Sequence, residues 1–132
     1  DVESRGLGDV YKRQVWHGIC AAILARTEWG VKDEAVLSAI ACHTAGKPGM
    51  SRLDKILYLA DMTSAERDWA GVNKLRRLER NDLDAAMLVA LKQTNDFVLS
   101  QGKPLDPMSK AAYEDIQAQV EARAGTACGS SD

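Results

Sequence analysis

The sequence has few of the features that mark secreted or membrane-bound proteins. Only three of its 132 residues are cysteine, and Cys20, Cys42 and Cys128 are an odd, irregularly spaced set, so we expect reduced thiols and no disulfide framework. No apolar run approaches the roughly 20 residues that cross a bilayer, and the start lacks the charged-then-apolar pattern of a signal peptide. We therefore predict a cytoplasmic location and no membrane partner.

Neither sign of charge is in clear excess. The 17 basic and 19 acidic residues give a net charge of -2, so there is no positive field to attract nucleic acid, and we expect no nucleic-acid partner. The basic cluster within residues 74–80 alternates with acidic residues and is interpreted as a solvated helix face.

The pattern of apolar residues predicts an all-α fold. A chain of this length, 45% hydrophobic and 27% charged, corresponds to one globular domain. From Val15 onward the apolar residues recur at helical spacing, and no segment alternates with period two. Helices are predicted over about 15–29, 33–43, 51–62, 72–79, 82–101 and 107–123. Residues 1–14 are expected to be a non-native or disordered leader, 15–123 a partial helical domain, and 124–132 a flexible tail.

Local signals place two features of the third helix. Ser51 and Asp54 have the spacing of a capping box, so the helix is expected to begin at Ser51. Its buried stripe is predicted to be Leu53, Ile56, Leu57 and Ala60.

The chain contains only two histidines, and they are the strongest candidates for chemistry. His17 and His43 both lie on the apolar sides of predicted helices, and Asp61 flanks an apolar stripe near the end of the third helix. Two neutral imidazoles and one carboxylate form a sensible ligand set for zinc, iron or manganese. A bound metal lowers the pKa of its water to about 7, which favours hydrolysis. The alternative is that both histidines are hydrogen-bonded residues of the core or its edge.

The segment from His43 to Ser51, HTAGKPGMS, is a second candidate. It ends on a helix N-terminus, where free N–H groups and the helix dipole favour phosphate, and Lys47 adds a positive charge. Arg67, in the next connection, could add a two-pronged contact to phosphate oxygens. The alternative is a plain interhelical turn built from glycine and proline.

Together these residues resemble the HD-domain phosphohydrolases, and specifically the YqeK family of symmetrical bis(5'-nucleosyl)-tetraphosphatases. The resemblance spans roughly residues 15–115. It is carried by Trp16-His17-Gly18, Ala39-Ile40, His43 to Ser51, Lys55-Ile56 with Tyr58, Ala60-Asp61, Arg67-Asp68 and Gly71-Val72.

The resemblance implies an HD-domain-like helical bundle and a metal-dependent enzyme that cleaves diadenosine tetraphosphate symmetrically into two ADP. It implies that the metal is divalent, with iron expected and zinc or manganese as alternatives, and that metal-activated water is the catalytic group. By the same resemblance, the metal ligands are His17, His43 and Asp61, and the residues near the polyphosphate are Thr44, Gly46, Lys47 and Arg67.

The resemblance also implies an upstream part that this sequence lacks. Family members carry an earlier histidine and an adjacent His-Asp pair, and residues 1–14 contain no histidine. The chain is therefore expected to correspond to the C-terminal portion of the enzyme and to hydrolyse weakly or not at all. The face of Trp16, Cys20 and Ile23 is expected to lack a packing partner, so we expect self-association into a homo-oligomer. The alternatives are a different HD-type nucleotidase and a non-enzymatic helical module that binds a partner helix.

Overall fold

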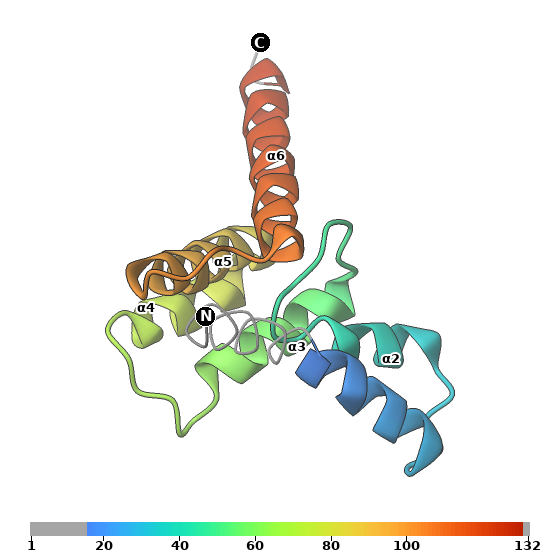
Figure 1. Cartoon of the computed structure of the whole chain (residues 1–132). Helices are drawn as coiled ribbons and strands as arrows, with labels where there is room; N and C mark the ends of the chain where they lie inside the picture. Colours follow the sequence, from blue (N-terminus) through green and yellow to red (C-terminus); the bar gives the residue numbers. More distant parts are fainter. Residues whose placement is uncertain (1–15, 131–132) are drawn as a thin grey trace.

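The chain folds into a bundle of helices, as the sequence predicts (Figure 1). A computed structural model describes residues 16–130, so the expected leader lies outside the described residues. Within this range there are helices and connections but no strand. The helices are residues 16–27, α2 (Glu34–Ala41), α3 (Arg52–Thr63), α4 (Val72–Asn81), α5 (Leu83–Ser100) and α6 (Pro107–Ser130).

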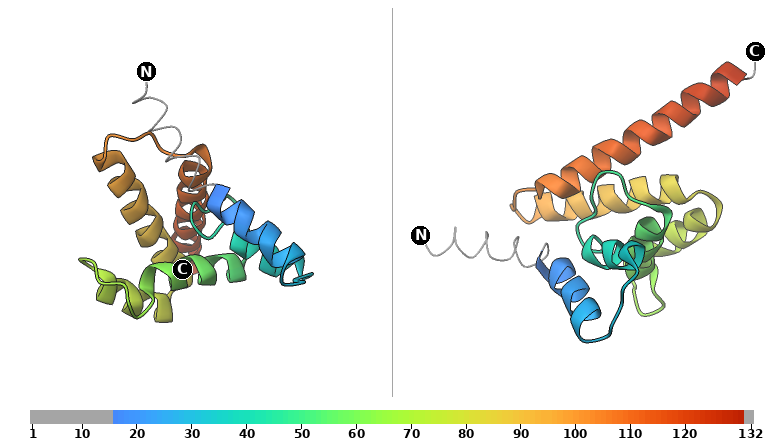
Figure 2. Two further views of the ribbon diagram at one scale, coloured as in Figure 1. Left: turned by 60° about the horizontal axis from the view of Figure 1, so that its bottom comes forward. Right: turned by 90° about the vertical axis from the view of Figure 1, so that its right-hand side faces the viewer.

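Helix α5 lies at the centre of the bundle and packs against α3, α4 and α6, while α2 packs on α3. Its small and apolar residues make this possible, because Ala86, Met87, Ala90 and Leu91 are completely buried. Leu59, Leu75, Ala112 and Ile116 from the surrounding helices complete the same core. The helix 16–27 lies beside α2, on the side of the bundle away from most of α6 (Figures 1 and 2).

Three helix starts follow directly from the sequence. Asp33 caps α2 by accepting a hydrogen bond from the Ala35 backbone N–H, and Asp82 caps α5 in the same way through Ala85. The predicted capping box of α3 is confirmed, with both reciprocal bonds between Ser51 and Asp54 present. Each such cap is worth about 1 kcal/mol, so these residues fix where the helices begin.

The predicted buried stripe of α3 is wrong. Leu53 and Ile56 are 40% and 45% exposed, and the buried residues of the helix are Asp54, Lys55, Tyr58 and Leu59. The Lys55 ammonium pairs with Asp84 of α5 at 2.7 Å, and the Tyr58 hydroxyl donates to Thr94 of the same helix. Because the Lys55 ammonium and the Tyr58 hydroxyl both have partners, the apolar stem of Lys55 and the ring of Tyr58 can cover the core.

Helix α6 begins as predicted but is longer. Ala112 and Ile116 are fully buried, as the predicted stripe requires. The helix continues through Gly125 to Ser130, whereas the sequence predicts an end at 123. Gly125 does not take the positive φ with which a glycine usually ends a helix. The second half of α6 extends beyond the rest of the bundle (Figure 2).

The apolar side chains of helix 16–27 are largely uncovered. Trp16, Ile23 and Leu24 of helix 16–27 are each more than half exposed. The self-association expected from this face stays a prediction. None of the helices in the described range combines the length and apolar character needed to cross a bilayer.

Candidate functional site

The two histidines of the chain lie next to each other. His17 is on helix 16–27 and His43 is in the turn after α2, and their ring centroids are 5.6 Å apart. The Nδ1 atom of His43 is within hydrogen-bond distance of the Ile40 carbonyl oxygen. Because a carbonyl oxygen can only accept, Nδ1 carries the hydrogen, and in the neutral tautomer with this bond Nε2 has the lone pair that a metal needs. Backbone carbonyls orient metal-binding imidazoles in this way.

A glycine allows this approach of the two helices. Gly18 is buried against the last turn of α2. A Cβ atom at this position would lie far inside contact distance of the Ala41 carbonyl oxygen and 3.0 Å from its carbon. Only glycine fits there, and the close packing sets His17 beside His43. In the sequence, the only sign that Gly18 allows this close packing is its place directly after His17 in the motif.

Asp61 is paired with an arginine and is not grouped with the two histidines. Its side chain is 47% exposed, and its carboxylate faces the Arg67 guanidinium at 3.6 Å. Arg67 also donates from Nε to the Asp61 carbonyl. Among the side chains that the structure describes, no three of histidine, cysteine, aspartate or glutamate are grouped so that they could hold a metal ion. The structure therefore brings together two of the three expected ligands, and their imidazole nitrogens suit zinc, iron or manganese.

Lys47 of the loop between α2 and α3 faces a buried carboxylate. Its ammonium donates to the Ser38 hydroxyl at 2.8 Å and lies 3.8 Å from Asp54. Asp54 is almost fully buried and also accepts hydrogen bonds from Ser38 and from the Ser51 backbone. A buried carboxylate needs such partners, so Lys47 compensates its charge. The capping-box spacing identifies Asp54 in the sequence, but not this second role.

The same loop is held by α6, which is far away in the sequence. The Ser109 hydroxyl donates to the Ala45 carbonyl at 2.8 Å, and the Gly49 N–H donates to Asp115 at 2.9 Å. Gly46 has a φ of +75°, and a Cβ there would meet side chains of α5 and α6 at 3.3 Å. Gly46 therefore lets the loop pack closely on the core, and Thr44 lies half-buried in the same loop. The loop is thus fastened to α5 and α6 through Gly46, Ala45 and Gly49.

Arg76 positions the segment that carries Arg67. Its guanidinium donates to the backbone carbonyls of Thr63, Ser64 and Arg67 at 2.8–3.0 Å. These carbonyls lie at the last residue of α3 and just beyond it, where no helical N–H follows to donate to them. The interpretation of the basic cluster as a solvated face is therefore wrong for Arg76.

The two cysteines whose side chains are described differ in environment. Cys42, next to His43, is buried, and Cys20 is exposed. Burial, with a smaller contribution from the Asp54 charge, raises the pKa of the Cys42 thiol to about 11. The thiol therefore stays protonated at neutral pH, whereas a metal ligand would need to be a thiolate.

Comparisons with known proteins give a consistent result. The chain is 37% identical over 100 residues to a protein of Bacillus subtilis (strain 168) named bis(5'-nucleosyl)-tetraphosphatase, symmetrical, covering 76% of this chain and 54% of the relative. It is 39% identical over 106 residues to a protein of the same name from Halalkalibacterium halodurans, covering 80% and 57%. The chain thus spans little more than half the length of these curated relatives. No family model matches it.

A solved structure has the same fold. It is a crystal structure of a Clostridium acetobutylicum protein described as a predicted HD superfamily hydrolase involved in NAD metabolism. The two chains are 38% identical and superpose with a TM-score of 0.76, over 78% of this chain and 55% of the other. The HD-domain-like helical bundle expected from the sequence is therefore confirmed.

Proposed function

We propose that this chain, which belongs to the HD-domain family of symmetrical bis(5'-nucleosyl)-tetraphosphatases, carries part of a site that hydrolyses diadenosine tetraphosphate to two ADP. The observation that supports this most directly is the pair of imidazoles, His17 and His43, where His43 begins the HTAGKPGMS loop that α6 holds by hydrogen bonds. The same segment thus carries His43, a candidate metal ligand, and Lys47, a cation proposed to meet phosphate.

The proposed metal ligands are His17, His43 and Asp61. His43 is oriented by the Ile40 carbonyl, and the Asp61 carboxylate, 47% exposed and 3.6 Å from the Arg67 guanidinium, would have to turn from this pairing to share the cation of the histidines. A divalent transition metal, iron or alternatively zinc or manganese, supplies Lewis-acid chemistry and activates water when bound.

Thr44, Gly46, Lys47 and Arg67 are proposed to lie along the polyphosphate. The Lys47 side chain is 34% exposed and can exchange part of its contact with Asp54 for a phosphate oxygen. Arg67, 52% exposed, offers a planar fork that matches phosphate geometry. These two cations would offset the charge that develops when water attacks one of the two middle phosphorus atoms. The central P–O–P linkage then breaks, and diadenosine tetraphosphate plus water yields two ADP.

Metal analysis tests the proposed ligands. The purified chain is loaded with iron, zinc or manganese, and bound metal is measured by mass spectrometry. We expect His17→Ala, His43→Ala and Asp61→Asn each to weaken binding. Asp68→Asn, which alters an exposed carboxylate of the neighbouring connection, is the matched control and should bind as the unmodified chain does. Unchanged binding in both histidine variants would refute the site.

Product analysis tests the reaction. The metal-loaded chain, in excess over diadenosine tetraphosphate so that slow turnover is detected, should release ADP as the nucleotide product. Release of ATP with AMP would mean asymmetric cleavage and would refute symmetrical hydrolysis. Dephosphorylation of mononucleotides without ADP release would favour a different HD-type nucleotidase. A folded chain that neither binds metal nor releases nucleotide would favour the helical interaction module.

A further inference from the structure

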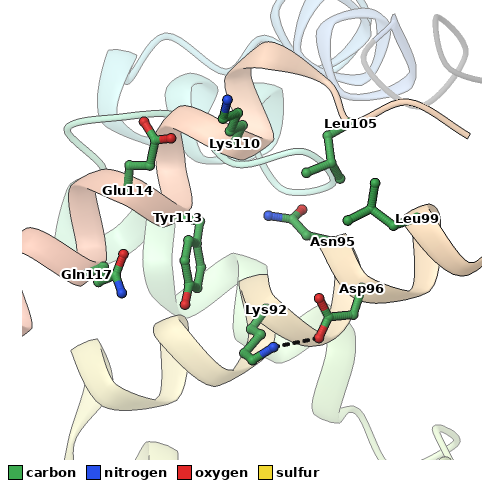
Figure 3. A pocket seen from close by; sticks show the side chains of 9 residues that line it. All are labelled: Lys92, Asn95, Asp96, Leu99, Leu105, Lys110, Tyr113, Glu114 and Gln117. Atoms are coloured by element: carbon green, nitrogen blue, oxygen red, sulfur yellow. Dashed lines mark hydrogen bonds and ion pairs between the residues drawn. The ribbon is translucent and has the colours of Figure 1, made fainter.

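A separate cavity lies between α5 and α6, and neither histidine lines it (Figure 3). Its volume is about 300 Å³, at the small end of the roughly 300–1,000 Å³ typical of ligand sites. This is room for one ring system and too little for a dinucleotide.

The walls of the cavity suit a flat ligand. Tyr113 of α6 extends its ring toward α5 along one side, and Leu99 and Leu105 approach each other at the other end (Figure 3). An aromatic face with apolar neighbours favours stacking with a planar ring.

A buried amide lies at the centre of the cavity. Asn95 of α5 is only 7% exposed, and its side chain points into the space between the helices (Figure 3). Among the described residues its one hydrogen bond runs from Nδ2 to the Ser109 carbonyl, at the long distance of 3.5 Å. A buried amide normally has partners for its two donors and its acceptor. Asn95 therefore retains an acceptor and a donor for a ligand.

The charges around the cavity are balanced. On α5, Lys92 is paired with Asp96 at 2.8 Å, and on α6 Lys110 and Glu114 lie one turn apart. Two positive and two negative groups give no net field for a polyphosphate, so the cavity favours an uncharged ligand.

We propose that this cavity binds a single adenine base, as part of a nucleoside. The Asn95 carboxamide offers an acceptor for the adenine N6 amino group and a donor for N7, which is the pairing by which asparagine recognises adenine in nucleic acids. Tyr113 stacks on the ring, as aromatic residues do with exposed bases.

The cavity is connected to the candidate active-site loop. Ser109, whose carbonyl accepts from Asn95, holds the loop by donating from its hydroxyl to Ala45. A base bound at Asn95 would therefore be linked to the loop through one residue, Ser109. The proposal does not depend on hydrolysis or on a metal.

Equilibrium binding of adenosine to the full chain tests the proposal. The titrations are run calorimetrically with a chelator present, so that no metal is bound at the histidines. Uridine and inorganic phosphate are the comparison probes, and phosphate reports binding at the candidate active-site loop. The variants are Asn95→Leu and Tyr113→Leu, with Gln93→Ala on the exposed side of α5 as the control. Circular dichroism establishes that each variant is folded. If the buried Asn95 variant fails to fold, the half-buried Tyr113 variant still decides the outcome.

We expect saturable adenosine binding that is weakened about 5-fold to 100-fold by the Asn95 and the Tyr113 substitution. The Gln93 variant should bind as the unmodified chain does, uridine should bind more weakly, and phosphate should not compete. The proposal is overturned if adenosine does not saturate at millimolar concentration, if folded Tyr113→Leu binds normally, if uridine binds equally well, or if phosphate displaces adenosine. Because the metal is absent throughout, failure of this proposal leaves the metal-binding and product tests of the proposed function unaffected.

Discussion

The substitution Gly18→Ala separates the packing of helix 16–27 from the chemistry of its histidine. The added Cβ would clash with the Ala41 backbone, which is not a flexible side chain and cannot turn away. Restoring a normal contact distance requires the two helices to move apart by roughly 1 Å. Overpacking of this kind costs about 1–3 kcal/mol, and the gain in helix propensity returns about 1 kcal/mol. We expect a net loss of stability of about 0–2 kcal/mol.

The larger effect is expected on metal binding. The same displacement moves His17 away from His43, whose rings are now 5.6 Å apart. Disturbing the support of a metal ligand typically costs about 10-fold to 100-fold in affinity. Metal titration and urea unfolding are therefore measured on the same preparation.

Gly125→Ala is the matched control for this substitution. It makes the same change in a helical, exposed glycine that has no atom within 4 Å of the added Cβ. It should leave metal affinity unchanged and stabilise its helix by up to about 1 kcal/mol. If Gly18→Ala kept both the affinity and the stability of the unmodified chain, the close helix contact would not be what places His17.

Three further predictions concern residues around the site. Iodoacetamide at pH 8 should alkylate Cys20 and spare Cys42. Burial raises the pKa of the Cys42 thiol to about 11, so about one Cys42 thiol in a thousand is ionised at this pH. Equal labelling of the two cysteines in peptide mass spectrometry would contradict the burial of Cys42. Asp54→Asn should lower the free energy of unfolding by about 1–3 kcal/mol in urea titration, because it removes the charge that Lys47 compensates, and unchanged stability would contradict that pairing. Arg76→Met should cost about 1–2 kcal/mol by releasing backbone carbonyls, and an equal loss in a matched Met variant of its exposed neighbour at position 77 would argue against a specific role.

The helices and their starts could be predicted because their causes are local. A cap such as Asp33, or the pair Ser51 and Asp54, acts over two or three residues, so its spacing in the sequence is its spacing in space. The buried face of α3 could not be predicted in this way. Lys55 can be buried because its ammonium donates to the carboxylate of Asp84, 29 residues away. A hydrophobicity pattern cannot show this partner and assigns a lysine to the surface.

In the candidate site, too, partners that are distant in the sequence could not be predicted. The motif identifies His17, His43 and the loop as a group, because their residue types are unusual at that spacing. It does not show that the loop is fastened by Ser109 and Asp115 of α6, whose positions 64 and 66 residues away have no local signature. Such partners become visible only when the fold brings the helices together.

The two halves of the histidine pair are supported very differently, and this determines how a metal would act on the chain. His43 follows α2 in a segment that α5 and α6 hold through Gly46 and Ser109. Helix 16–27 instead meets α2 at Gly18 and forms an exposed ion pair with it between Arg26 and Glu34. Most of the large apolar side chains of this helix lie in solvent. Segments with few buried contacts open locally at the lowest free energy. A cation shared by the two imidazoles would add its binding energy to this weakest contact, because ligands stabilise only the state that binds them. The metal would thus act in part as a structural link that fastens helix 16–27 to the rest of the bundle.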